Sequence, residues 1–135
     1  MANRNFASGG KIYAMHIKPV LLDCQIVLGA SGAVSSFSGQ LIQSVTKSAT
    51  GTYSIVLQDN YATLLGIVNA APKIASGTSN IDAVEQVGSM VNSSNPASSG
   101  ASITIQTLNP SGVVANGTSG AQINFLIYLN DSSVL

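Results

Sequence analysis

The chain has 135 residues, a formal net charge of zero and 7% charged residues, against about 25% in an ordinary globular domain. Its length fits one domain with a core of its own. The basic residues are scattered, which argues against nucleic-acid binding by charge: Arg4, Lys11, Lys18, Lys47 and Lys73. No apolar run is long enough for a membrane span, and residues 1–18 lack the apolar segment of a secretory signal.

The low charge also bears on the surface of the protein. Hydrophobic residues make up 45% of the chain, whereas free soluble proteins usually keep their net charge away from zero. Two interpretations remain open. The chain is either a compact β domain covered with Ser, Thr and Asn, or a protein whose surface is largely covered in an assembly, and the composition favours the assembly.

The first third of the chain contains an arm and two apolar segments. Residues 1–10 are small and polar, with Phe6 as their one aromatic residue, and predict a flexible arm. Lys11–Lys18 alternates like a strand, and Pro19 marks its end or an edge. Val20–Leu28 is more continuously apolar, which suits a strand covered on both faces or one that passes from the core into a subunit contact.

The central stretch predicts a hairpin between loops. Gly29–Gly39 has the composition of a loop, anchored by Val34 and Phe37. The predicted hairpin pairs residues 40–47 with residues 52–58, and Gly51 suits the turn because it tolerates a positive φ.

The next segments are shorter and less regular. Residues 60–65 predict a corner with a short turn, residues 66–75 form another apolar run, and residues 76–80 predict a loop. Residues 81–92 are ambiguous, because apolar residues recur at helical spacing and Ser79 with Asp82 resembles a capping box. Gly88 weakens the helix, and the surrounding β pattern favours a strand.

The last third reads more simply. Residues 93–100 predict a loop. Ser102–Leu108 and Gln122–Asn130 alternate clearly and predict strands, joined by a turn at Asn109–Gly112 and a loop at residues 113–120. In the last strand Ile123, Phe125, Ile127 and Leu129 are predicted to share one face.

These segments predict an all-β fold, either a β-sandwich of jelly-roll type or a Greek-key barrel. No fixed repeat is visible, which argues against a solenoid or propeller. The predicted organisation is an N-terminal arm at residues 1–10 and a single β domain at residues 11–135.

Residues that could carry chemistry are few and isolated. His16 is the single histidine and Cys24 the single cysteine, so neither a histidine metal pair nor an internal disulfide can form. We interpret His16 as structural and Cys24 as a buried small hydrophobe. The carboxylates do not cluster as a calcium loop requires: Asp23, Asp59, Asp82, Glu85 and Asp131. We therefore predict no enzyme, with no catalytic, cofactor-binding or metal-binding residues.

Two stretches carry a family resemblance. GQLIQSVTKSATGTYSIVLQDNYATLLG, at residues 39–66, and TIQTLNPSG with GAQINFLIYLNDSSV, at residues 104–134, resemble small all-β structural proteins of tailed bacteriophages. The role associated with these proteins is head decoration, or cement. The resemblance implies a protein made in the host cytoplasm that binds the major capsid protein on the outside of the head, as a homo-oligomer (trimer or dimer), without a nucleic-acid or membrane partner.

For such a role we expect capsid or subunit contacts from the arm and from apolar edge residues, namely Phe6, Ile12, Tyr13 and Val134. The alternative is a tail- or fibre-associated module that binds a receptor or carbohydrate. Such a module would usually show exposed aromatic rings for stacking on sugars, and the chain has only four Tyr and three Phe.

Overall fold

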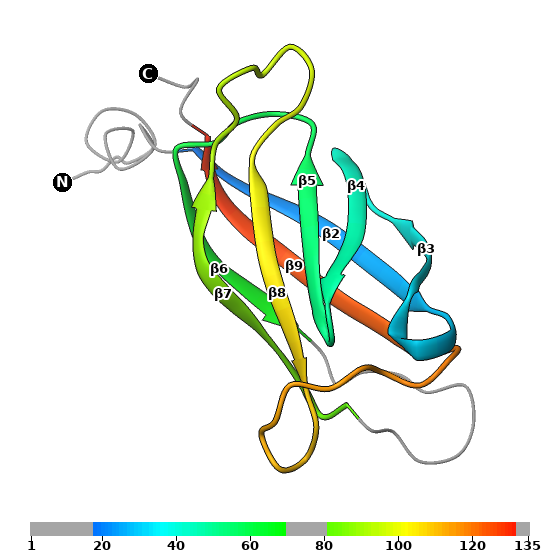
Figure 1. The fold of residues 1–135 in the computed structure, drawn as a ribbon. Coiled ribbons are helices and arrows are strands. Elements are labelled where there is room, and N and C mark those ends of the chain that lie inside the picture. Colours follow the sequence, from blue (N-terminus) through cyan, green and yellow to red (C-terminus); the bar gives the residue numbers. More distant parts are fainter. Residues whose placement is uncertain (1–17, 70–80, 132–135) are drawn as a thin grey trace, which may run out of the picture.

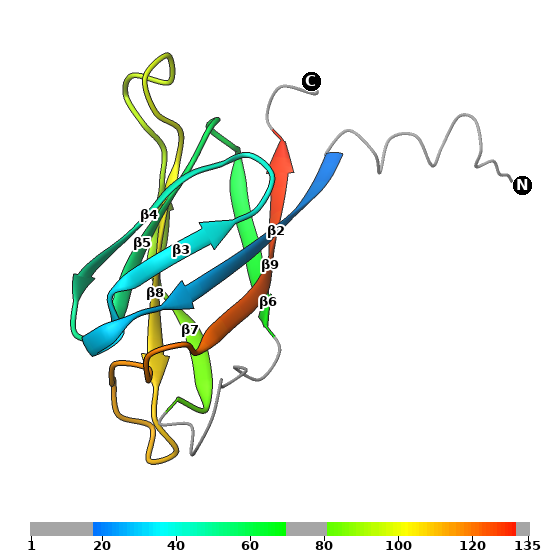
Figure 2. The same cartoon turned by 90° about the vertical axis from the view of Figure 1, so that its right-hand side faces the viewer.

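The computed structural model describes residues 18–69 and 81–131, and these form two antiparallel sheets packed face to face (Figure 1, Figure 2). In spatial order, the first sheet contains β3 (Val34–Ser38), β2 (Lys18–Leu28), β9 (Gln122–Asp131) and β6 (Thr63–Asn69). The second contains β4 (Ile42–Ala49), β5 (Thr52–Leu57), β8 (Ser102–Leu108) and β7 (Ala83–Val91). The prediction of an all-β sandwich is confirmed.

The core lies between the two sheets and follows from the alternation of the strands. In β5 and β8 every second residue is buried, and in β9 the buried residues are those predicted to share one face. Burying one such Ile, Leu or Phe side chain contributes about 1.5–3 kcal/mol. The largest fully buried side chains come from both sheets: Tyr53, Ile26, Leu28, Ile55, Leu57, Ile103, Ile105, Ile123, Ile127, Leu129 and Thr107.

Tight turns and one well-packed crossover connect the strands. Gly51 closes the β4–β5 hairpin with a φ of +59°, as predicted. From β8 to β9 the chain crosses between sheets, and buried Thr107 donates its hydroxyl to the carbonyl of Ala115 at 2.6 Å. Further along this crossover, Gly117 lies against Leu28 and Ile81, where a side chain would collide with both.

The prediction of a loop over Gly29–Gly39 is wrong. Residues 34–38 form β3, which pairs with Gln25–Leu28 of β2, and only Ala30–Gly32 forms a 3-10 turn, η1. The reason is that β2 offers a free edge, so that even a serine-rich segment can complete backbone hydrogen bonds there. Phe37 is 39% exposed and therefore is not the buried anchor that we expected, whereas Val34 packs against the core.

The structure also corrects β2 and the corner before β6. Within this chain β2 is covered on one face, because Leu22, Cys24 and Ile26 are buried while Leu21 is 54% exposed. The predicted corner at residues 60–65 is shorter than expected, since β6 already begins at Thr63 through its pairing with β9. The ambiguous segment at residues 81–92 contains strand β7, as favoured, and no helix.

Several predictions fall outside the described residues. These are the arm at residues 1–10, the strand expected before residue 18, and the loop at residues 76–80. No helix in the described part of the chain is long and apolar enough to cross a membrane.

Candidate functional site

The thiol of Cys24 and the phenol of Tyr53 are held inside the sandwich. Cys24 is 2% exposed and faces Phe125 of β9. Burial, together with the negative charge of Asp23, raises the pKa of the thiol from 9.0 to about 12. Cys24 is therefore a protonated core residue at neutral pH, as its sequence context indicated. Burial also raises the pKa of Tyr53, whose hydroxyl donates to the carbonyl of Gly32 at 2.7 Å.

No metal-binding cluster is found in the part of the chain that the structure describes, because no group of three His, Cys, Asp or Glu side chains comes together there. His16 lies outside that part. The search for a site therefore turns from reactive groups to the surface.

The outer face of the β3-β2-β9-β6 sheet carries an exposed apolar cluster. Across β2 and β9, Leu21 lies opposite Tyr128. Across β9 and β6, Tyr128 lies opposite Gly66 and Leu126 lies opposite Val68. We call this cluster the apolar half of the face; its exposed members are Leu21 (54%), Leu65 (52%), Val68 (60%), Leu126 (37%) and Tyr128 (36%).

A hollow lies within the apolar half at Gly66. The register between β6 and β9 shifts between Leu64 and Gly66, which leaves Leu65 in a bulge. A Cβ at Gly66 would meet no atom within 4 Å. The resulting hollow has a volume of about 290 Å³ and is lined by Leu65, Gly66, Ile67, Val68 and Tyr128. It is open, apolar, and bordered by protruding side chains.

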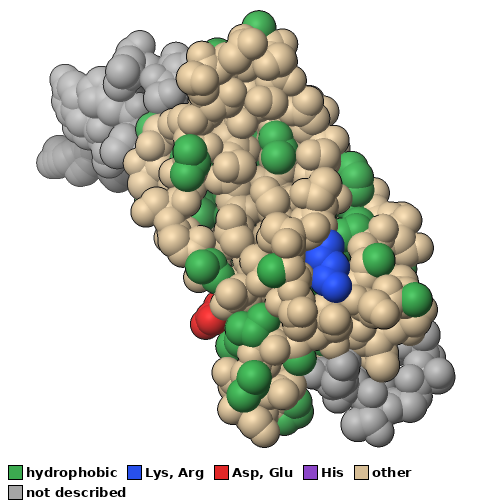
Figure 3. All heavy atoms as spheres, viewed as in Figure 1, with side chains coloured by type: hydrophobic (Ala, Val, Ile, Leu, Met, Phe, Trp, Pro, Cys, Tyr) green, Lys and Arg blue, Asp and Glu red, His purple; other side chains and the backbone are tan. Residues whose placement is uncertain are grey.

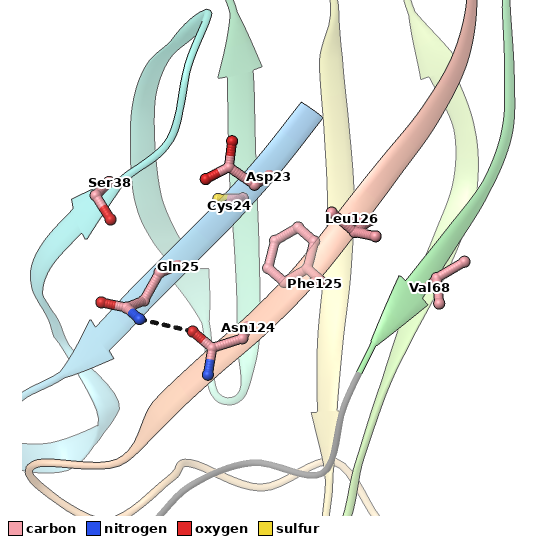
Figure 4. Close-up of a pocket in the computed structure, with 8 residues that line it drawn as sticks. All are labelled: Asp23, Cys24, Gln25, Ser38, Val68, Asn124, Phe125 and Leu126. Atoms are coloured by element: carbon pink, nitrogen blue, oxygen red, sulfur yellow. Dashed lines mark hydrogen bonds between the residues drawn. The ribbon is translucent and has the colours of Figure 1, made fainter. Parts of the chain in front are cut away.

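The rest of the same face is polar. The amide of Gln25 on β2 donates from Nε2 to Oδ1 of Asn124 on β9 at 2.7 Å, and Figure 4 shows the two groups meeting across the strands. Next to them, Asp23 and Asn124 line a second open hollow of about 420 Å³, which reaches Leu126 and Val68 of the apolar half. A carboxylate at this position remains accessible to water.

The outer face of the other sheet differs in character. Its cross-strand partners pair hydroxyl and amide side chains, such as Thr46 with Ser54 and Ser54 with Thr104. The space-filling view of this side shows mostly neutral polar surface with isolated apolar spots and little charge (Figure 3). Among the exposed large apolar side chains of the described residues, Val91 of β7 has the highest exposed fraction, 64%. The two faces of the sandwich are therefore chemically distinct, and only one carries an apolar cluster among the described residues.

Such an arrangement can bind a protein surface. An apolar cluster bordered by polar groups on a soluble protein is the pattern of an interaction site. Serine and threonine coats, in contrast, keep a sheet face hydrated. The geometry supports contact with another apolar surface, with the Gly66 hollow able to accept one protruding side chain.

The contact residues predicted from the sequence, Phe6, Ile12, Tyr13 and Val134, all lie outside the described residues. Sequence reasoning missed the apolar half itself. The available signal was that Leu21, Leu126 and Tyr128 are large and apolar on the strand face that should be polar.

Comparisons with known proteins add no relative: a scan of protein-family models, a search of curated proteins and a search of solved structures each found no match to this chain.

Proposed function

We propose that this chain is a structural protein of a bacteriophage virion that binds the outside of the head as a homo-oligomer and stabilises the shell of the major capsid protein. In this role it acts as a decoration, or cement, protein. It is made in the host cytoplasm and needs neither a cofactor nor a nucleic-acid partner.

The observation that carries this proposal is the exposed apolar half on a protein with very few charges. Leu21, Val68 and Leu126 remain exposed on one sheet face, although the chain has enough Ser and Thr to cover it, as the opposite sheet shows. The family resemblance points in the same direction. Its two stretches supply β4, β5, the start of β6, most of β8, and β9, which together make up much of the sandwich.

The physical demands on a decoration protein agree with this surface. Binding a shell requires many moderate contacts at symmetric positions, and an oligomer gains avidity without new kinds of contact. With five basic and five acidic residues in the chain, charge contributes little to such binding. We therefore expect binding to the head to change little between low and high salt.

Reconstitution on particles that lack the protein tests the proposal. The full chain, a chain without residues 1–9 and a Phe6→Ala variant are each mixed with such heads, and bound protein is measured after sedimentation. We expect the full chain to saturate symmetric sites and to raise the temperature at which heads rupture, and both changes in the arm to lower occupancy. Failure of the full chain to bind would contradict the decoration role; unchanged occupancy of the two arm variants would contradict the contact assigned to the arm.

A tail or fibre module that binds a receptor or carbohydrate is the second candidate. The observation in its favour is the open hollow of about 420 Å³, where Asp23, Gln25 and Asn124 offer groups that can hydrogen-bond a sugar. However, the amides of Gln25 and Asn124 already bond to each other. Binding of the purified chain to host cells, lost in an Asn124→Ala variant, would favour this candidate over head decoration.

A further inference from the structure

We propose that the outer face of the β3-β2-β9-β6 sheet binds a second copy of this chain, face to face, around a two-fold axis that runs parallel to β9. This inference deepens the proposed function and rests on it for the place of the dimer on the particle. The dimer itself follows from the shape, size and charge of the face.

The face carries a protrusion and a hollow that can fit each other when two copies meet. One row across three strands places Leu21 on β2, Tyr128 on β9 and Gly66 on β6. Leu21 protrudes and is 54% exposed, whereas the hollow of about 290 Å³ lies at Gly66. A two-fold interface uses the same patch on both copies, so it needs a protrusion and a matching hollow within one patch.

The register shows how these two features meet. When two sheets pack face to face, their two-fold axis lies in the plane between them. An axis parallel to β9 and passing over Tyr128 exchanges the positions of β2 and β6, which are the neighbours of β9 on either side. Leu21 of each copy then lies over Gly66 of the other. Neighbouring strands are about 4.8 Å apart, so Leu21 and Gly66 lie at about the same distance from the axis, on opposite sides of Tyr128.

The size of the face fits a weak, reversible contact. The three strands that overlap about this axis are β2, β9 and β6, with 11, 10 and 7 residues. At about 4.8 Å between strands and about 3.3 Å per residue they cover roughly 450 Å² in plan, and side-chain relief adds to this. A standard interface buries roughly 800 Å² on each partner. Packed sheets with aligned strands are also a common arrangement within β-sandwiches.

The charge of the face is compatible with a second copy. Asp23 lies in one row with Leu126 and Val68 and lines the open hollow of about 420 Å³. The two-fold axis places Asp23 over Val68 of the other copy and two strand spacings away from the other Asp23, so like charges do not face each other. Lys18 pairs with Asp131, so the first and the last described residues lie at the same end of the sheet. The axis keeps these ends of both copies on the same side.

The first test measures the mass of the full chain by sedimentation equilibrium over a range of concentrations, without capsids. We expect a monomer–dimer equilibrium. Leu21→Lys removes the protrusion, and Gly66→Leu fills the hollow. In a symmetric dimer each substitution occurs at two contacts. Each variant should therefore raise the dissociation constant of the dimer roughly a hundredfold or more. Val91→Lys is the matched control: Val91 is 64% exposed on the other sheet, and its change should leave the equilibrium as it is.

A second test reads the geometry directly. Leu21→Cys and Gly66→Cys variants are prepared separately, and Cys24 does not interfere because it is 2% exposed. Both changes alter the contact, so the variants are mixed at a chain concentration above the dissociation constant that sedimentation gives for the mixture. A short bifunctional maleimide should cross-link the mixture of the two variants and neither variant alone. Equal melting temperatures of all variants would show that each still folds, as expected for exposed positions.

The outcomes separate this inference from the proposed function. A chain that stays monomeric, a dimer that survives both Leu21→Lys and Gly66→Leu, or cross-linking of Leu21→Cys alone would each overturn the inference. A monomer that binds heads and loses occupancy in Leu21→Lys would assign the face to the capsid protein and also overturn it. A dimer with the expected cross-link that binds no head would support the inference and contradict head decoration.

Discussion

Alkaline pH should destabilise the folded state of this protein through Cys24. The thiol is 2% exposed in the core, and its pKa is raised from 9.0 to about 12 by burial and by the neighbouring charge of Asp23. Because the folded pKa is the higher one, the stabilisation is fully present below pH 9 and is lost as the pH rises toward 12. At about pH 10.5 the unfolded chain has released this proton and the folded chain still holds it. One pKa unit corresponds to about 1.4 kcal/mol, so the folded state should lose about 2 kcal/mol there.

The measurement compares urea denaturation at about pH 8 and about pH 10.5 for the natural chain and for Cys24→Ala, in the presence of a reducing agent. Tyrosine ionisation affects both proteins alike, so the difference between their losses isolates the thiol. We expect the natural chain to lose about 2 kcal/mol more than the variant. Equal losses in the two proteins would refute the reasoning, because they would mean that the thiol ionises as easily in the folded core as in water.

Two further predictions concern the core. Tyr53→Phe leaves the buried carbonyl of Gly32 without the hydroxyl that donates to it at 2.7 Å, and should cost about 1–3 kcal/mol in urea denaturation; no loss would mean that water replaces the bond. Gly117→Ala places a Cβ against Leu28 and should destabilise by about 1–3 kcal/mol, whereas Gly66→Ala enters open space and should be neutral or slightly stabilising. Equal effects of the two glycine changes would contradict the packing described.

The strands that sequence reasoning predicted well are those whose own pattern determines them. In β8 and β9 the residues alternate clearly, so the members of each strand face could be grouped residue by residue. The same holds for the β4–β5 hairpin, where Gly51 marks the turn. In these elements local preference and burial agree.

The elements that were missed depend on partners distant in the sequence. Most residues of β3 are serine, and the segment becomes a strand because the free edge of β2 accepts it. Likewise, β6 begins early because β9 lies beside Thr63. Local composition does not predict such pairing, so the sequence predicted a loop for β3 and a corner for the start of β6.

The candidate site was hidden for the same reason. Leu126 and Tyr128 are visible in the sequence as apolar residues on the outer side of a strand. Their neighbours across the sheet, Val68 and Leu21, come from segments far away in the chain and join them only through the register. The hollow at Gly66 depends on the bulge at Leu65, and no local sequence pattern predicts this bulge.

A reconstruction of the native particle at side-chain resolution tests the central claim most directly. The account predicts density for this sandwich at symmetric positions over the outside of the head, touching the major capsid protein, with copies paired across the β3-β2-β9-β6 face. Density confined to the tail, or the absence of this chain from the particle, would contradict head decoration.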